Sequence, residues 1–154
     1  MLFHPNRTEQ LARIAGRLDA ATAPTAPILG AVLQSAERAK IAGQGRPASH
    51  IERLIACGAW TDAALGLLEI CIPRWQIARL IYDGGEWNCK LSPRCEWPEW
   101  LDQVIETHHT DLAIAILRAV VEAIRQEDEE QAVTGSAVRP PVDGEILISC
   151  DNFG

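Results

Sequence analysis

The sequence predicts a mainly helical α+β domain, in which two helical hairpins pack on a β-hairpin of about residues 74–92. Three observations support this prediction. Apolar residues recur at helical spacing through most of the chain. The dipeptide Gly84-Gly85 separates two strand-like segments, WQIARLIYD and EWNCKLS, as in a tight hairpin. The chain has 154 residues, of which 47% are hydrophobic, which is enough for one domain with a core.

Residues 1–47 are predicted to form two N-terminal helices and a linker. Asn6 or Thr8 can cap the first helix, whose apolar stripe begins at Leu11. A connector with prolines and small residues follows, and Pro27 suits the first turn of the second helix. These two helices either complete the helical bundle or dock on it more loosely.

Residues 48–127 are predicted to form the compact α+β core domain. Ser49 and Glu52 in SHIE match a capping box, which predicts that a short helix begins there. Thr61 is a candidate cap for the next helix, and Pro73 closes it. Together these two helices make the first helical hairpin.

The arms of the predicted β-hairpin each have one apolar side. The side chains expected on the buried face are Trp75, Ile77, the stem of Arg79, Trp87, Cys89 and Leu91. In the second arm these residues alternate cleanly with polar ones. That alternation predicts one buried and one wet face.

The second helical hairpin is predicted to follow the strands. Pro98 suits a first helical turn, and Trp100, Val104 and Ile105 recur as one apolar stripe. Thr110 is a candidate cap for the last helix, LAIAILRAVVEAI, which is apolar around most of its circumference. That helix is therefore expected at the centre of the core.

Residues 128–154 are predicted to form an acidic, flexible tail. They contain one Arg against six Asp or Glu, together with small residues and a proline pair. Within the tail, ILIS at residues 146–149 is a candidate edge strand, because it follows a turn-forming Asp-Gly pair.

The composition argues against several classes of function. The net charge of −7 and the acidic middle of the chain predict no nucleic-acid partner, because phosphates would be repelled. No segment is long and apolar enough to predict a membrane span. Five cysteines without a close CxxC pair favour reduced thiols, and the first residues lack a secretory signal pattern, so we expect a cytoplasmic protein. No nucleotide, hydrolase or metalloprotease motif is present, and no cofactor is predicted.

The segment DGGEWNCKLSPRCEWPEW concentrates the residues of chemical interest. Cys89 and Cys95 with His108 and His109 offer metal ligands, but the cysteine spacing is not that of a zinc knuckle. Cys89 is in phase with the buried face, which favours packing. Adjacent histidines point apart, and His108 continues the predicted helical stripe, so the pair suits a core edge better than a metal or catalytic site.

The leading hypothesis is a non-catalytic protein–protein interaction or regulatory module that binds a protein partner or itself. Tryptophan is enriched at interface anchors. The candidate contact surface consists of Trp87, Cys95, Trp97 and Trp100. One alternative is a small enzyme or ligand-binding protein with a pocket near Cys89, Cys95 and His108. A second alternative is a small metal-binding protein.

Overall fold

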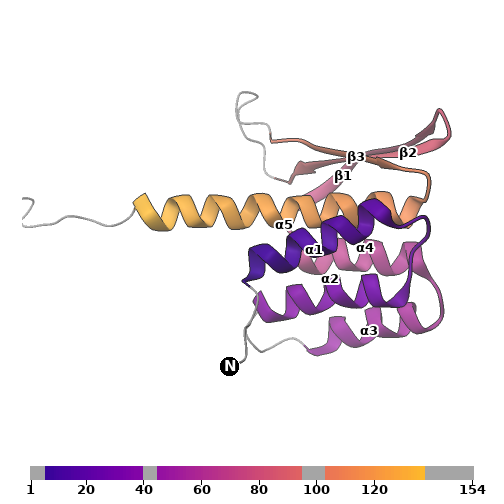
Figure 1. The fold of residues 1–154 in the computed structure, drawn as a ribbon, viewed down its shortest axis with the longest axis horizontal. Helices are drawn as coiled ribbons and strands as arrows, with labels where there is room; N and C mark the ends of the chain where they lie inside the picture. The colour runs from indigo at the N-terminus through magenta and orange to yellow at the C-terminus, as the bar shows by residue number, and fades with distance from the viewer. Residues whose placement is uncertain (1–5, 40–44, 95–102, 138–154) are drawn as a thin grey trace, which may run out of the picture.

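The computed structural model describes residues 6–39, 45–94 and 103–137, with side chains placed in 6–36, 49–94 and 103–133. In these ranges the chain forms five helices and one three-stranded antiparallel sheet, so the predicted α+β, mainly helical class is confirmed. The elements, shown in Figure 1, are α1 (Arg7–Ala20), α2 (Ala26–Ala39), α3 (Gly45–Ala56), α4 (Trp60–Cys71), β1 (Trp75–Asp83), β2 (Glu86–Pro93), β3 (Ile105–His109) and α5 (Leu112–Ala137).

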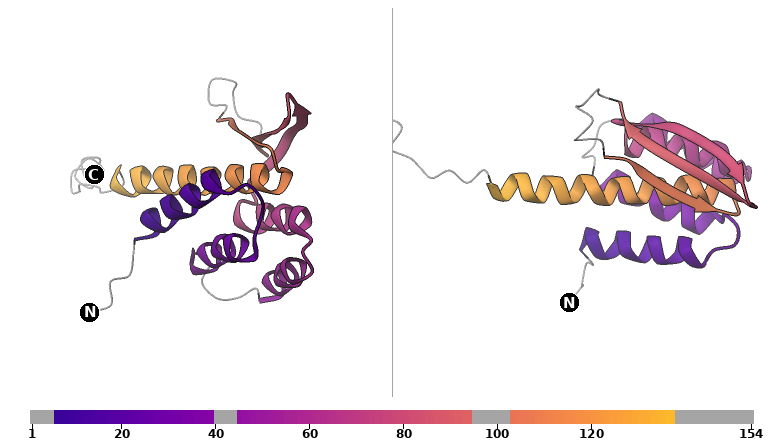
Figure 2. Two further views of the ribbon diagram at one scale, coloured as in Figure 1. Left: turned by 45° about the vertical axis from the view of Figure 1, so that its right-hand side comes forward. Right: turned by 90° about the horizontal axis from the view of Figure 1, so that it is seen from above.

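Helix α5 lies between the sheet and the other helices. One face of the sheet rests on α5. Helices α1 and α4 pack on other sides of α5, and α2 and α3 lie farther from the sheet (Figures 1 and 2). All side chains from Ala113 to Leu117 are buried, as predicted for a helix at the core centre. In the described parts of the chain, no helix covers the outer face of the sheet (Figure 1).

The N-terminal helices complete the bundle, which is the first of the two predicted alternatives. Asn6 caps α1, and its Oδ1 accepts a hydrogen bond from the backbone N–H of Thr8 at 3.4 Å. Leu11 of α1 and Leu29 of α2 belong to the same core cluster as Leu91 in the sheet. Both helices therefore contribute to the core that the sheet covers.

The start signals predicted for α3 and α4 were wrong. Helix α3 begins at Gly45, so Ser49 lies inside it rather than at its cap. Helix α4 begins at Trp60, and Ala59 occupies its cap position without a side-chain hydrogen bond. The break between them is as expected, because Gly58 takes a positive φ of 76°, which glycine adopts at little cost.

The predicted β-hairpin is confirmed, and a third strand extends it. β1 and β2 pair through a turn in which Gly84 and Gly85 have φ angles of 63° and 89°. The helical stripe predicted through Val104 and Ile105 was wrong, because Ile105–His109 forms strand β3 on the free edge of β2. Threonine and histidine are poor helix formers, and here they gain ladder hydrogen bonds instead. Residues 95–102 lie outside the described residues, so the predicted helix start at Pro98 stays a prediction.

The predicted alternation of β1 fails after its third residue. Ala78 has no partner in β2, and the register shifts between Ile77 and Arg79, which is a β-bulge. Between the turn and the bulge the register is regular and places Arg79 on the outer face, opposite Lys90, and Leu80 on the inner face, where it packs against the core. The stem of Arg79 is therefore not on the buried face.

Helix α5 is longer than the sequence predicted. Asp111, rather than Thr110, caps it by accepting a hydrogen bond from the N–H of Ile114 at 3.1 Å. The helix continues to Ala137, so the first part of the predicted tail is helical. Glutamate and glutamine favour helices, and an ion pair of 2.9 Å between Arg7 and Asp128 holds this part against α1. Residues 138–154, with the candidate strand 146–149, lie outside the described residues.

None of the described helices is both long enough and apolar enough to cross a membrane.

Candidate functional site

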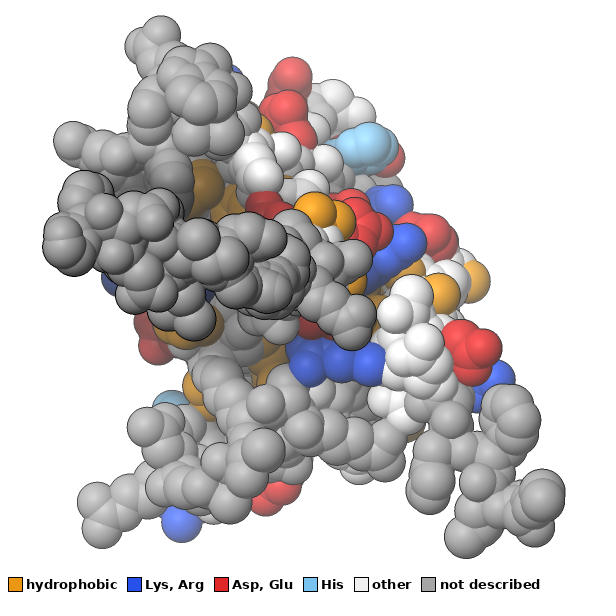
Figure 3. Space-filling model, turned by 90° about the vertical axis from the view of Figure 1, so that its left-hand side faces the viewer, with side chains coloured by type: hydrophobic (Ala, Val, Ile, Leu, Met, Phe, Trp, Pro, Cys, Tyr) orange, Lys and Arg blue, Asp and Glu red, His pale blue; other side chains and the backbone are white. Residues whose placement is uncertain are grey.

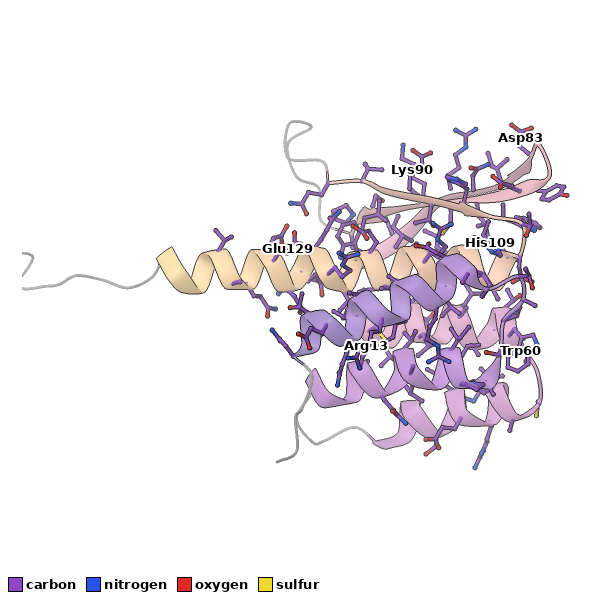
Figure 4. All side chains as sticks on the ribbon, in the orientation of Figure 1. Arg13, Trp60, Asp83, Lys90, His109 and Glu129 are labelled. Carbon is purple, nitrogen blue, oxygen red and sulfur yellow. The ribbon has the colours of Figure 1, made fainter. Side chains whose placement is uncertain are left out.

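The outer face of the sheet is mainly polar, and none of the described helices covers it. Figure 4 shows Lys90 pointing from this face away from the helices. By register and alternation the face consists of Gln76, Arg79, Ile81, Asp83, Glu86, Asn88, Lys90, Ser92, Glu106 and His108. We call this set the outer sheet face.

Charges on the outer sheet face are arranged in rows across the strands. Arg79 of β1 lies opposite Lys90 of β2, which lies opposite Glu106 of β3. At the turn end, Asp83 lies opposite Glu86. Directly opposed like charges destabilise an antiparallel pair. The face therefore has a basic pair and an acidic pair, each of which is unfavourable by itself.

A neutral row separates these two pairs. Ile81, Asn88 and His108 lie side by side across the three strands, two residues from each charged row. Among the described residues, neither member of the basic pair and neither member of the acidic pair forms an ion pair. The charges on this face are thus free to interact with a second molecule.

Trp87 lies on the inner face of the sheet, at its turn end. It is half-buried, packs against the core cluster, and contacts the ring of Tyr82 with a centroid distance of 5.2 Å. Tyr82 is 58% exposed, so this aromatic pair reaches the surface only at the turn. Trp87 is the one member of the predicted contact surface that the structure describes. Cys95, Trp97 and Trp100 lie outside the described residues.

Cys89 and His108 lie on opposite faces of the sheet. Cys89 points toward the core and is fully buried, and burial raises the pKa of its thiol to about 11. His108 is exposed on the outer sheet face, and its carbonyl oxygen accepts a hydrogen bond from Arg118 of α5 at 2.6 Å. The structure therefore does not bring these two residues of the predicted pocket together.

His109 has a structural task. Its Nδ1 accepts a hydrogen bond from the backbone N–H of Asp111 at 2.9 Å, which places the ring proton on Nε2. Nε2 then donates to the carbonyl oxygen of Ala21 at 2.9 Å. The ring thus joins the start of α5 to the loop after α1. The expectation that the two adjacent histidines point apart holds, but His109, not His108, covers the core edge.

A metal site receives no support from the described residues, since no three His, Cys, Asp or Glu side chains lie close enough to hold an ion there. Cys95 is outside the residues to which this statement applies.

At the opposite end of the sheet, the partly buried carboxylate of Glu127 joins α5 to β1. Nε1 of Trp75 donates to Oε1 of Glu127 at 3.1 Å. Burial raises the pKa of Glu127, while this hydrogen bond and the charge of Arg74 act in the opposite direction. Figure 3 views the end of the molecule toward which α5 projects, and acidic and basic side chains lie intermixed there. At this end Arg7 of α1 forms an ion pair with Asp128 of α5.

The sequence contained part of the signal for the outer sheet face. The alternation of Glu86, Asn88 and Lys90 predicted that β2 has one wet face. The alternation of Trp75 and Ile77 at the start of β1 assigned Arg79 to the other face, because the bulge at Ala78 changes the phase between Ile77 and Arg79.

Comparison of the chain with protein-family models, with curated proteins and with solved structures finds no match.

Proposed function

We propose that this protein is a non-catalytic protein–protein interaction module that binds through its outer sheet face. The observation that carries the proposal is that the basic pair and the acidic pair form no ion pair among the described residues and lie on a sheet face that no described helix covers. A sheet face with fixed charges of both signs offers electrostatic complementarity, which gives an interface its specificity. Trp87 is the one described member of the predicted tryptophan surface, and because it lies on the inner face it is not part of the outer sheet face.

The alternative readings find less support among the described side chains. A thiolate is the reactive form of cysteine, and the raised pKa of Cys89 keeps this group protonated at neutral pH. Both ring nitrogens of His109 are engaged in hydrogen bonds to the backbone. The proposal therefore assigns these groups to packing rather than to catalysis or metal binding.

The proposal places the protein in the cytoplasm. Cys57 is exposed and Cys89 is buried, and both are free thiols. Exposed free thiols persist most readily in a reducing compartment.

The test is affinity capture from a native extract of the source cells with the tagged full chain as bait. The variant Arg79→Ser with Lys90→Ser removes the basic pair, and Arg13→Ser on the exposed face of α1 is the control. Figure 4 shows Arg13 on the helical side of the molecule, away from the sheet. Loss of captured proteins with the double variant alone supports the proposal. Equal capture by all three baits, measured by quantitative mass spectrometry, contradicts it.

A further inference from the structure

We infer that the partner of the outer sheet face is a second copy of this chain, in a face-to-face dimer with antiparallel strands. This inference rests on the proposed function, because it names the occupant of the same surface. It depends on one geometric property: the basic pair and the acidic pair lie at equal spacing on either side of the neutral row.

The spacing follows from the register. Arg79 and Asp83 each lie two residues from Ile81 along β1, and Lys90 and Glu86 each lie two residues from Asn88 along β2. At about 3.3 Å per residue, each charged row is about 7 Å from the neutral row. The positive and negative rows are thus mirror positions about the middle of the face.

A twofold axis along the neutral row converts this spacing into ion pairs. Such an axis lies in the plane between two facing copies, reverses the strand direction and keeps each strand above its own counterpart. Arg79 then faces Asp83 of the second copy, and Lys90 faces the second copy's Glu86. Ile81 meets its own counterpart at the axis and supplies a small apolar contact.

The pairing relieves an unfavourable feature of the single chain. In one copy Arg79 is opposite Lys90, and Asp83 is opposite Glu86, so the members of each pair repel each other, although Lys90 also has Glu106 of β3 on its other side. In the dimer each of these four side chains gains an opposite charge. Because two copies supply the same four groups, the arrangement forms four intermolecular ion pairs.

The charge pattern favours a second copy over a polyanion. A nucleic acid would be attracted to Arg79 and Lys90 but repelled by Asp83 and Glu86 about 13 Å away on the same face. The chain carries a net charge of −7, which adds to this repulsion. A second copy of the same face, rotated by 180° about the neutral row, places an opposite charge over both the basic pair and the acidic pair.

The small area of the face makes this a weak dimer. Three strands about 4.8 Å apart and about eight residues long give a projected area of about 400 Å². Stable interfaces bury about 800 Å² on each partner. We therefore expect weak self-association that increases with protein concentration. Salt should weaken it, because the ion pairs of so small an interface remain accessible to solvent ions.

The experiment is sedimentation velocity of the full chain from about 5 μM to about 500 μM, which spans the range of weak interfaces. The single chain has a mass of 16.9 kDa. The variants are Lys90→Glu, Glu86→Lys and the double exchange, with Arg13→Glu as a control outside the face. Each single reversal is expected to weaken self-association at least about tenfold, because it places like charges across the interface. The double exchange restores it, and Arg13→Glu leaves it unchanged.

The double exchange is decisive because Lys90 and Glu86 lie about 13 Å apart in one chain and cannot pair there. Recovery in the double variant therefore reports contact between copies. A second exchange, Arg79→Asp with Asp83→Arg on β1, tests the same axis independently and serves if a β2 variant does not fold by circular dichroism.

A wild-type chain that stays at 16.9 kDa at every concentration overturns the inference. So does a double exchange that fails to restore an association lost in the single variants. If the wild-type chain stays monomeric, but it captures a different protein that the Arg79→Ser, Lys90→Ser variant does not capture, this inference fails and the proposed function stands. If capture is also unchanged, both fail.

Discussion

Deletion of Ala78 is expected to leave the protein folded, although it removes a residue from the middle of a β-strand. Ala78 is exposed and has no partner in β2. Without it, Ile77 and Arg79 become neighbours in a regular ladder and keep the faces that they have now. Leu80 likewise stays on the core side. The expected change in the free energy of unfolding is within about 1 kcal/mol, as for other surface changes.

The cost would be much larger if β1 alternated regularly, as its sequence suggests. With the register fixed at the turn, the deletion would then move Trp75 and Ile77 off the core, at about 2 kcal/mol or more each, and would turn Gln76 inward. Burying the Gln76 amide without hydrogen-bond partners costs about 1–3 kcal/mol further. The sum approaches the whole stability of a small domain, about 5–15 kcal/mol.

Urea unfolding, followed by tryptophan fluorescence and circular dichroism, measures the change in the free energy of unfolding that the deletion causes. The matched control is deletion of Asn88, which lies in the regular ladder of the central strand β2. That deletion shifts paired residues to the wrong face and is expected to cost several kcal/mol. If deletion of Ala78 destabilises the protein as much as deletion of Asn88, the bulge does not determine the facing of β1.

Two further predictions concern the helices. Glu127→Gln keeps the hydrogen-bond acceptor but removes the buried charge. Because burial raises the pKa of Glu127, the folded state holds this proton more tightly than the unfolded chain, so the ionised group lowers stability at neutral pH. The variant should therefore be more stable than the wild type at pH 7, and the difference should vanish below about pH 4, where both states are protonated; unfolding curves across pH test this, and a constant difference would contradict it. Gly16→Ala in α1 should stabilise by up to about 1 kcal/mol, because a Cβ there meets no atom within 4 Å. Gly66→Ala in α4 should gain less, because its Cβ would lie 3.1 Å from Cγ1 of Ile51, and equal melting-temperature gains for the two variants would refute the contact.

Local signals in the sequence were enough to predict most of the helices and the hairpin. Asn6 satisfies a free N–H of α1 with its own side chain, and Gly84 supplies the positive φ that the turn requires. The last helix was recognisable because its first half, LAIAILRAVVEAI, is apolar except for Arg118 and Glu122. In each case the cause of the structure lies within a few residues of its effect.

Strand β3 depends on a partner distant in sequence. Val104 and Ile105 are adjacent apolar residues, which suit a helix stripe as well as a strand end. What decides between them is the pairing of Thr107 with Cys89 and the hydrogen bond from Oγ1 of Thr107 to the carbonyl oxygen of Ala115 at 2.8 Å. Neither contact can be derived from spacing along the chain. The acidic end of α5 was misread for a related reason, because its contacts to Arg7 and Trp75 come from distant segments.

The outer sheet face was misassigned in the sequence because β1 changes phase at its bulge. Trp75 and Ile77 lie before Ala78, and their alternation, continued through the bulge, would place Arg79 on the buried face. The turn at Gly84-Gly85 instead sets the register on the other side of the bulge, where Asp83 pairs with Glu86 and Arg79 pairs with Lys90. β-Bulges are known to redirect side chains next to functional sites. Here the bulge lets Trp75 and Ile77 face the core while Arg79 stays on the outer face, so a charge pattern that is unfavourable in one copy and complementary between two coexists with a buried start of the strand.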